Sequence, residues 1–69
     1  MSIQLNIRLI QLRRKAGLTQ NQLAADSALA HHNICRHERG KHSPSLDSAI
    51  KYAIFYDITL DELVFGEKL

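Results

Sequence analysis

Three of the four histidines and the only cysteine of this 69-residue chain lie close together, at His31, His32, Cys35 and His37. Imidazole nitrogen and thiolate sulfur are ligands for zinc, and residues three or four apart share one face of a helix. A structural zinc site usually takes four ligands in paired spacings, however, and His42 is the only further candidate. We therefore expect neither a metal site nor a cofactor, and interpret these residues as side chains that a helix presents to a partner.

The composition is that of one small domain covering residues 1–69. Hydrophobic residues make up 45% of the chain and charged residues 23%, and this length has room for a single core. The lone cysteine excludes an internal disulfide and fits a reducing compartment. Basic residues near the start interrupt any signal peptide, and no apolar stretch is long enough to cross a bilayer. These features predict a cytoplasmic protein with no membrane partner.

The chain contains no constellation typical of an enzyme. Neither a Ser-His-Asp arrangement nor a glycine-rich phosphate loop nor a pair of pocket carboxylates can be assembled from the sequence. A chain this small also has little room for a deep cleft. We therefore expect no enzymatic activity.

Charge is divided unevenly along the chain. The net charge is +2, but residues 1–45 carry seven Lys and Arg against two acidic residues, whereas residues 46–69 carry two against five. A basic first part and an acidic last part indicate a face for a polyanion such as nucleic acid. A mixed, solvated surface explains the same counts equally well.

Capping signals predict an all-α chain of five short helices. The stretch LTQNQL contains a capping box, Thr19 with Gln22, between the two leucines of a hydrophobic staple. The stretch ITLDEL repeats this pattern, and Ser45 after Pro44 marks another helix start. The expected helices cover about residues 3–16, 20–26, 31–39 and 46–56, and a last one begins near residue 60.

Hydrophobic spacing predicts which faces of these helices are buried. In the helix over 31–39, Ile34 lies on one side, and the opposite side is polar and basic. The helix over 46–56 is expected to bury one side, made of Leu46, Ala49, Ile50, Ala53 and Tyr56.

Four sequence segments in order resemble the Cro/C1-type helix-turn-helix family of bacterial and phage DNA-binding regulators. They are LRRKAGLTQNQLA, ICRHERGK, PSL and ITLDEL, and the match runs from about Leu9 to Leu63. The resemblance implies a compact five-helix, lambda-repressor-like domain with its helix-turn-helix at about 19–39. It also implies sequence-specific binding of double-stranded DNA by a transcription regulator, for which we expect repression.

The resemblance also implies roles for individual residues. The helix over 31–39 would lie in the major groove. Base contacts are expected from the start and outer face of that helix, at His31, His32, Asn33 and Arg36. DNA backbone contacts are expected around it, at Gln20, Arg39, Lys41 and Ser45. Arg13 and Glu38 match an ion pair that ties the first helix to the third in family members.

Four positions depart from the family pattern. Ala28 and Ala30 stand where a turn glycine and a Ser or Thr helix cap are frequent. His37 replaces a usual apolar residue, which predicts a partly buried histidine, and Asp57 replaces a frequent glycine. Either the turn before the helix over 31–39 therefore differs slightly from that of its relatives, or this helix is less firmly anchored.

Apolar residues without an evident place in the core indicate a protein interface. We expect a homodimer through Ile54, Phe55, Val64 and Phe65, bound to a pseudo-palindromic operator. A second stripe, Ile3, Ile7 and Ile10, offers another surface, and the segment LVFGEKL could cover part of either. A toxin or another regulatory protein is an alternative partner, and a protein-interaction module in which DNA binding is secondary is the alternative function.

Overall fold

The computed structural model describes residues 5–65, and every regular element in this range is a helix. The elements are α1 (Leu5–Lys15), α2 (Gln20–Ser27), α3 (His31–Arg39), α4 (Leu46–Tyr56) and α5 (Leu60–Phe65). The predicted all-α, five-helix architecture is confirmed; the expected first turn at residues 3 and 4 lies outside the described residues. Within residues 5–65, no helix has the length and apolar character needed to cross a membrane.

Side-chain caps begin the helices where the sequence predicted them. Thr19 Oγ1 accepts from the Gln22 amide at 3.1 Å, and Gln22 Oε1 accepts from the Thr19 amide at 2.8 Å, which completes the capping box. The same reciprocal pair joins Thr59 and Glu62 at 2.9 and 3.1 Å. Ser45 Oγ accepts from the Ser48 amide at 3.2 Å. Local sequence alone therefore specifies three of the helix starts.

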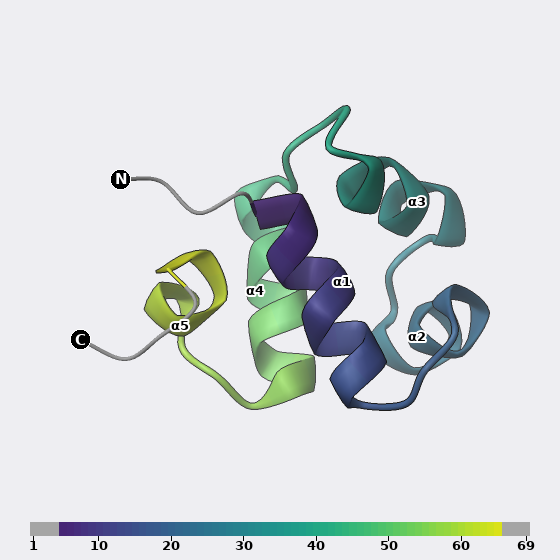
Figure 1. The fold of residues 1–69 in the computed structure, drawn as a ribbon, viewed down its shortest axis with the longest axis horizontal. Coiled ribbons are helices and arrows are strands. Elements are labelled where there is room, and N and C mark those ends of the chain that lie inside the picture. The colour runs from purple at the N-terminus through teal and green to yellow at the C-terminus, as the bar shows by residue number, and fades with distance from the viewer. Residues whose placement is uncertain (1–4, 66–69) are drawn as a thin grey trace.

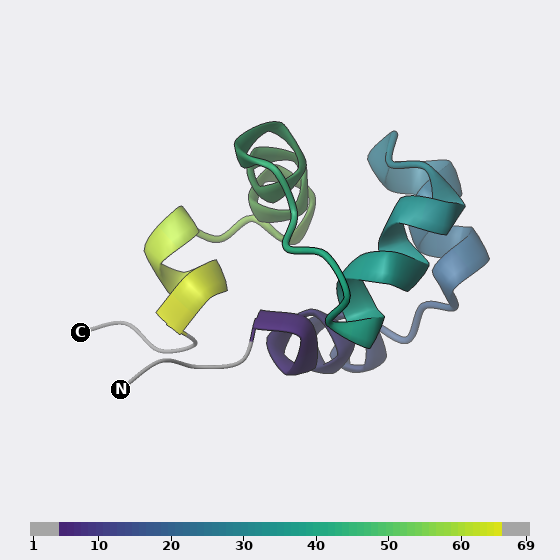
Figure 2. The same ribbon diagram turned by 90° about the horizontal axis from the view of Figure 1, so that it is seen from above.

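The helices surround one core to which each contributes a fully buried side chain. These side chains are Leu9, Leu23, Ile34, Tyr52 and Leu63. Helix α1 packs on α3 and α5, while α4 packs on α2 and α5. The pair α2 and α3 forms one side of the molecule and α5 the other (Figures 1 and 2). Burying one such large apolar side chain contributes about 1.5–3 kcal/mol, so each of these residues contributes substantially to holding its helix in place.

The buried face of α4 differs from the predicted one. Leu46 is 69% exposed and Ile50 37% exposed, whereas Tyr52, which we did not expect in the core, is 1% exposed. Ala49 and Ala53 are buried as predicted, and Tyr56 is partly buried against the core. The prediction was wrong because both faces of α4 are apolar, and hydrophobicity does not tell which face packs.

The turn between α2 and α3 keeps a left-handed residue although alanine stands where glycine is frequent. Ala28 ends α2 with φ 62° and ψ 23°, in the left-handed region, and Asp57 ends α4 with φ 56°. Ala30, at the cap of α3, makes no side-chain hydrogen bond. A left-handed alanine costs roughly 1–2 kcal/mol, so the turn is held in place by the packing of the helices on either side.

Replacing Ala28 by glycine should relieve this strain. We expect Ala28→Gly to raise the free energy of unfolding by about 0.5–1 kcal/mol, because glycine adopts positive φ without a Cβ clash. Thermal and urea unfolding measure the change. Ala25→Gly, at an exposed helical position of α2, is the matched control and should lower stability by a similar amount. Equal destabilisation by both substitutions would contradict the strained turn.

Candidate nucleic-acid interface

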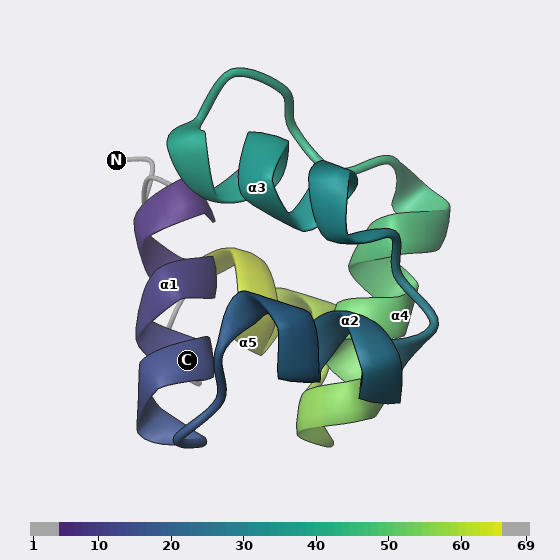
Figure 3. The ribbon, with the colours of Figure 1, turned by 90° about the vertical axis from the view of Figure 1, so that its right-hand side faces the viewer.

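Helix α3 presents a polar, basic face to solvent. His31, His32 and Arg36 are exposed and Asn33 is partly buried, so the four expected base-reading residues are brought together at its start and on its outer side. Figure 3 shows α3 and α2 on the face turned toward the viewer. Glu38 is the only acidic residue of α3, and it is buried. The exposed face of the helix therefore has no negative charge to oppose a phosphate backbone.

Three expected backbone contacts surround this face. Arg39 and Lys41 are exposed at the end of α3, which Gly40 terminates with φ 78°. The Lys41 amide donates to the Arg36 carbonyl at 3.3 Å and so fixes the path of the chain after the helix. Ser45 is exposed, and its hydroxyl caps α4. Their contacts with DNA stay predictions.

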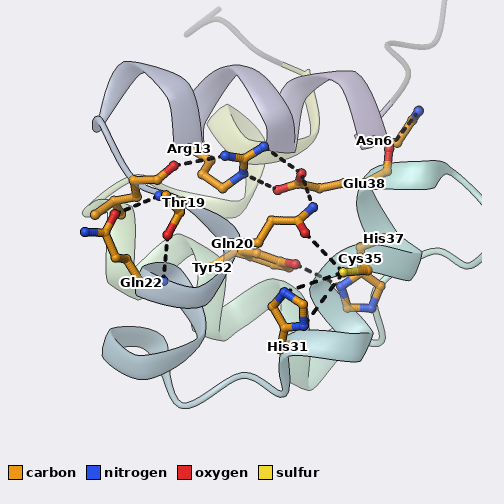
Figure 4. Close-up of polar contacts among 11 residues, drawn as sticks. Asn6, Arg13, Thr19, Gln20, Gln22, His31, Cys35, His37, Glu38 and Tyr52 are labelled. Atoms are coloured by element: carbon orange, nitrogen blue, oxygen red, sulfur yellow. Dashed lines mark hydrogen bonds and ion pairs between the residues drawn. The ribbon is translucent and has the colours of Figure 1, made fainter.

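The side-chain amide of Gln20, predicted to contact a phosphate, makes two hydrogen bonds to α3. Its Nε2 donates to Glu38 Oε1 at 3.0 Å, and its Oε1 accepts from Cys35 Sγ at 3.1 Å, so both ends of the amide are engaged inside the protein (Figure 4). The amide nitrogen carries two protons, and the bond to Glu38 uses one of them. A phosphate contact from Gln20 or from the backbone amides of the first turn of α2 stays a prediction.

The predicted ion pair between Arg13 and Glu38 is present and bidentate. Arg13 Nε donates to Glu38 Oε2 at 2.8 Å, and its Nη2 donates to Oε1 at 3.1 Å. Arg13 Nη1 also donates to the Leu18 carbonyl at 2.9 Å, just before the cap of α2. The hydrogen bond to Glu38 raises the pKa of Arg13 above its usual value despite partial desolvation. The pair thus joins α1, α3 and the turn that leads into α2.

His37, which we expected to be partly buried, is buried. It is 7% exposed, and its Nδ1 lies 2.9 Å from the Tyr52 hydroxyl, with the two rings edge to face. Burial raises the pKa of Tyr52. Burial also lowers the pKa of His37, and the charge of the neighbouring His42 lowers it further. A neutral imidazole whose Nδ1 accepts a hydrogen bond from the Tyr52 hydroxyl satisfies both of these buried atoms. This bond links α3 to α4.

The histidines and cysteine do not converge on a metal site. Cys35 Sγ lies 3.9 and 3.8 Å from the two ring nitrogens of His31, and its closest polar contact is Gln20. His32 is exposed and His37 is in the core. Among residues 5–65, no group of three or more His, Cys, Asp or Glu side chains is placed to hold an ion.

The apolar residues expected at a dimer interface divide into two kinds. Ile54, Val64 and Phe65 are 74%, 37% and 48% exposed. Phe55 was predicted to point away from the core, and this is wrong. Its side chain is partly buried against the core and packs edge to face on Tyr56. Leu46 and Ile50 extend the exposed side of α4, because they lie eight and four residues before Ile54.

The second apolar stripe is less exposed than its sequence pattern indicates. Ile7 is 47% exposed and Ile10 is partly buried. Ile3 and the end of LVFGEKL, residues 66–69, lie outside the described residues. Of the two surfaces, the α4 side has the aliphatic side chains with the larger exposed fractions, Leu46 and Ile54.

Helices α2 and α3 form a helix-turn-helix in which α3 presents a basic face outward and is held by a buried ion pair. This combination defines a class of regulatory domains. Residues 9–63 match the model of the helix-turn-helix family, and the chain belongs to this family, in its Cro/C1 type. The resemblance inferred from four sequence segments is thereby confirmed.

Two characterised proteins are similar to most of this chain. The HTH-type transcriptional activator BcrR of Enterococcus faecalis is 37% identical over 67 residues, which are 97% of this chain and 33% of that protein. This chain thus spans about a third of the length of that relative. The restriction-modification controller protein C.AhdI from Aeromonas hydrophila superimposes with a TM-score of 0.80 and 36% identity, covering 88% of this chain and 92% of that one. Neither name describes an enzyme.

The lowered pKa of His37 predicts a loss of stability in acid. The unfolded chain binds the proton near the ordinary value of 6.5, whereas the folded protein binds it only at lower pH. His37 therefore makes no pH-dependent contribution well above that value, and the free energy of unfolding falls as the pH drops below about 6.5. Urea unfolding between about pH 7 and pH 5 measures this slope.

The control for this experiment is His37→Gln, which keeps a partner for Tyr52 but does not titrate. We expect its stability to depend less steeply on pH over the same range, since the remaining titrating groups are unchanged. An identical slope in both proteins would contradict a buried neutral His37.

Proposed function

We propose that this protein is a sequence-specific, double-stranded-DNA-binding transcription regulator that inserts α3 into the major groove. The observation that carries the proposal is the exposed face of α3, which is polar and basic while the acidic residue of the same helix is buried and paired. A helix used only to bind another protein has no need of such a face. The major groove admits one α-helix, and phosphates on either side attract positive charge.

The individual contacts follow from side-chain chemistry. Arg36 can donate two hydrogen bonds to guanine, and Asn33 can both donate to and accept from adenine, each with about 1–3 kcal/mol of discrimination. His31 and His32 can donate or accept one bond to a base edge. Outside the bases, backbone phosphates are contacted by Arg39, Lys41, the Ser45 end of α4 and the amides at the Gln20 end of α2.

A homodimer would give the domain enough contacts for specific binding. The exposed apolar side of α4, with Val64 and Phe65 of α5, supplies the interface, and two copies of α3 would then read a pseudo-palindrome with half-sites about 34–36 Å apart. A toxin or another regulatory protein could occupy the same surface. That alternative predicts a heteromeric complex in which DNA binding is secondary.

Repression is the proposed direction of regulation. A domain bound across a promoter excludes RNA polymerase by occupancy, whereas activation needs an additional productive contact with the polymerase. BcrR is named as an activator, so a promoter–reporter assay with and without the protein decides the direction for this chain.

One experiment tests the central proposal. Incubating the protein with a pool of random duplexes and sequencing the bound fraction should reveal paired half-sites, and affinity for random duplex should fall steeply with salt. Recovery of no preferred sequence, together with salt-insensitive binding, would overturn the proposal in favour of a protein-interaction module.

Arg36→Ala should relax the preference at one base pair per half-site by about 1–3 kcal/mol, because the bidentate bond to a base is lost. Competition titrations with single-base variants of the selected site measure this. Lys41→Ala is the contrasting variant: it should weaken all duplexes alike and lower the salt slope by about 1 per protomer. An unchanged sequence preference in Arg36→Ala would show that α3 lies in the groove in another register.

Ile54→Glu should leave a folded monomer, because a side chain 74% exposed contributes little to the core, while a charge buried between two copies opposes association strongly. Sedimentation should show the lower mass, and affinity for the full site should fall to that of a half-site. Ile7→Glu, on the other apolar surface, is the matched control and should remain dimeric. The reverse result would move the interface to α1.

A further inference from the structure

The amide of Gln20 occupies an unusual place, between the buried ion pair and the helix proposed to read DNA. Glu38 Oε1 accepts from both Gln20 Nε2, at 3.0 Å, and Arg13 Nη2, at 3.1 Å. Together with Arg13 Nε on Oε2, three donors serve one carboxylate that is 6% exposed. Arg13 of α1 thus balances the charge of Glu38, and Gln20 of α2 donates the third hydrogen bond to its carboxylate.

The other end of the same amide binds α3 a second time. Cys35 Sγ donates its single proton to Gln20 Oε1 at 3.1 Å. Since Cys35 and Glu38 are three residues apart, they lie on the same side of α3, and Gln20 spans both. The amide orientation is determined by its partners, because a flipped amide would place Oε1 against the carboxylate.

The contacts extend to the start of α3. The Cys35 sulfur is nearly equidistant from both ring nitrogens of His31, at 3.9 and 3.8 Å, so it packs against the ring rather than forming one aligned hydrogen bond. Figure 4 shows the sequence of contacts from Arg13 through Glu38, Gln20 and Cys35 to His31. Gln20 of α2 thereby contacts His31, the first residue of α3, through Cys35.

We infer that Gln20 is a positioning residue: its amide clamps α3 to α2 at Glu38 and Cys35 and sets the orientation in which α3 presents its base-reading side chains. This inference rests on the proposed function. In this role Gln20 contributes to sequence specificity. A phosphate contact would instead raise the affinity for any duplex, whatever its sequence. Ala28 and Ala30 supply neither a relaxed turn nor a cap between these helices, so the clamp restrains α3 against α2 where these two residues do not.

The test replaces Gln20 with methionine, which keeps the length of the side chain and removes both hydrogen bonds. The Arg13–Glu38 pair keeps its own two bonds, so the variant should fold. Affinity for the duplex selected by the wild-type protein should fall about tenfold, while affinity for a scrambled duplex changes less than about twofold. Asn21→Met, at the exposed neighbouring position, should leave the ratio of the two affinities unchanged. An equal loss on both duplexes would overturn the inference in favour of a phosphate contact.

Two variants at Cys35 test the second hydrogen bond. Cys35→Ser retains a donor for Gln20 Oε1 and should keep the specific-to-scrambled ratio within about twofold, whereas Cys35→Ala should lower it by about threefold or more. Equal ratios for the two variants would exclude Cys35 from the clamp.

A measurement without DNA separates this inference from the proposed function. In the free protein, Gln20→Met should speed amide hydrogen exchange in α3 about tenfold relative to α4, because α3 loses its hydrogen bonds to α2 while those to α1 and α4 remain. Unchanged relative exchange would overturn the clamp even if DNA binding were specific. If the wild-type protein selects no duplex, the proposed function fails, and the exchange experiment still decides the role of Gln20.

Discussion

The buried carboxylate of Glu38 is the point on which the arrangement of the first three helices depends. Burying a charge is costly unless it is paired and hydrogen-bonded, and here a bidentate arginine and an amide meet that requirement. Arg13 also binds the carbonyl of Leu18, beside the cap of α2. A single residue of α3 is therefore held by α1, α2 and the turn that joins them. Such a network has one geometry that satisfies all its members, and this favours one pose of α3 over others.

The turn between α2 and α3 makes this network more important. Ala28 adopts a left-handed conformation without the freedom of glycine, and Ala30 leaves the start of α3 without a side-chain cap. Neither residue stabilises the turn locally. The position of α3 is instead maintained by Ile34 in the core, by Glu38 on one side and by the His37–Tyr52 bond to α4 on the other. Acid that protonates His37 would weaken the last of these.

A small core also explains the exposed apolar side of α4. Five large side chains, one from each helix, fill the centre, and Leu46, Ile50 and Ile54 find no place in it. In a 69-residue chain the surface is large relative to the interior. The residues left outside are available for assembly, which would link the quaternary state of the domain to its affinity for DNA.

The sequence by itself determined the helices and the family. Capping boxes at Thr19 and Thr59 and the cap at Ser45 are local signals, in which a side chain bonds an amide three residues away, and they need no knowledge of the rest of the fold. The ion pair of Arg13 with Glu38 was also foreseen, through the family resemblance. Tertiary structure decided the rest. Both faces of α4 are apolar, so only packing could select Tyr52 over Leu46 and Ile50. The partners of Gln20 are 15 and 18 residues away in sequence, so the engagement of its amide follows from how α2 and α3 meet.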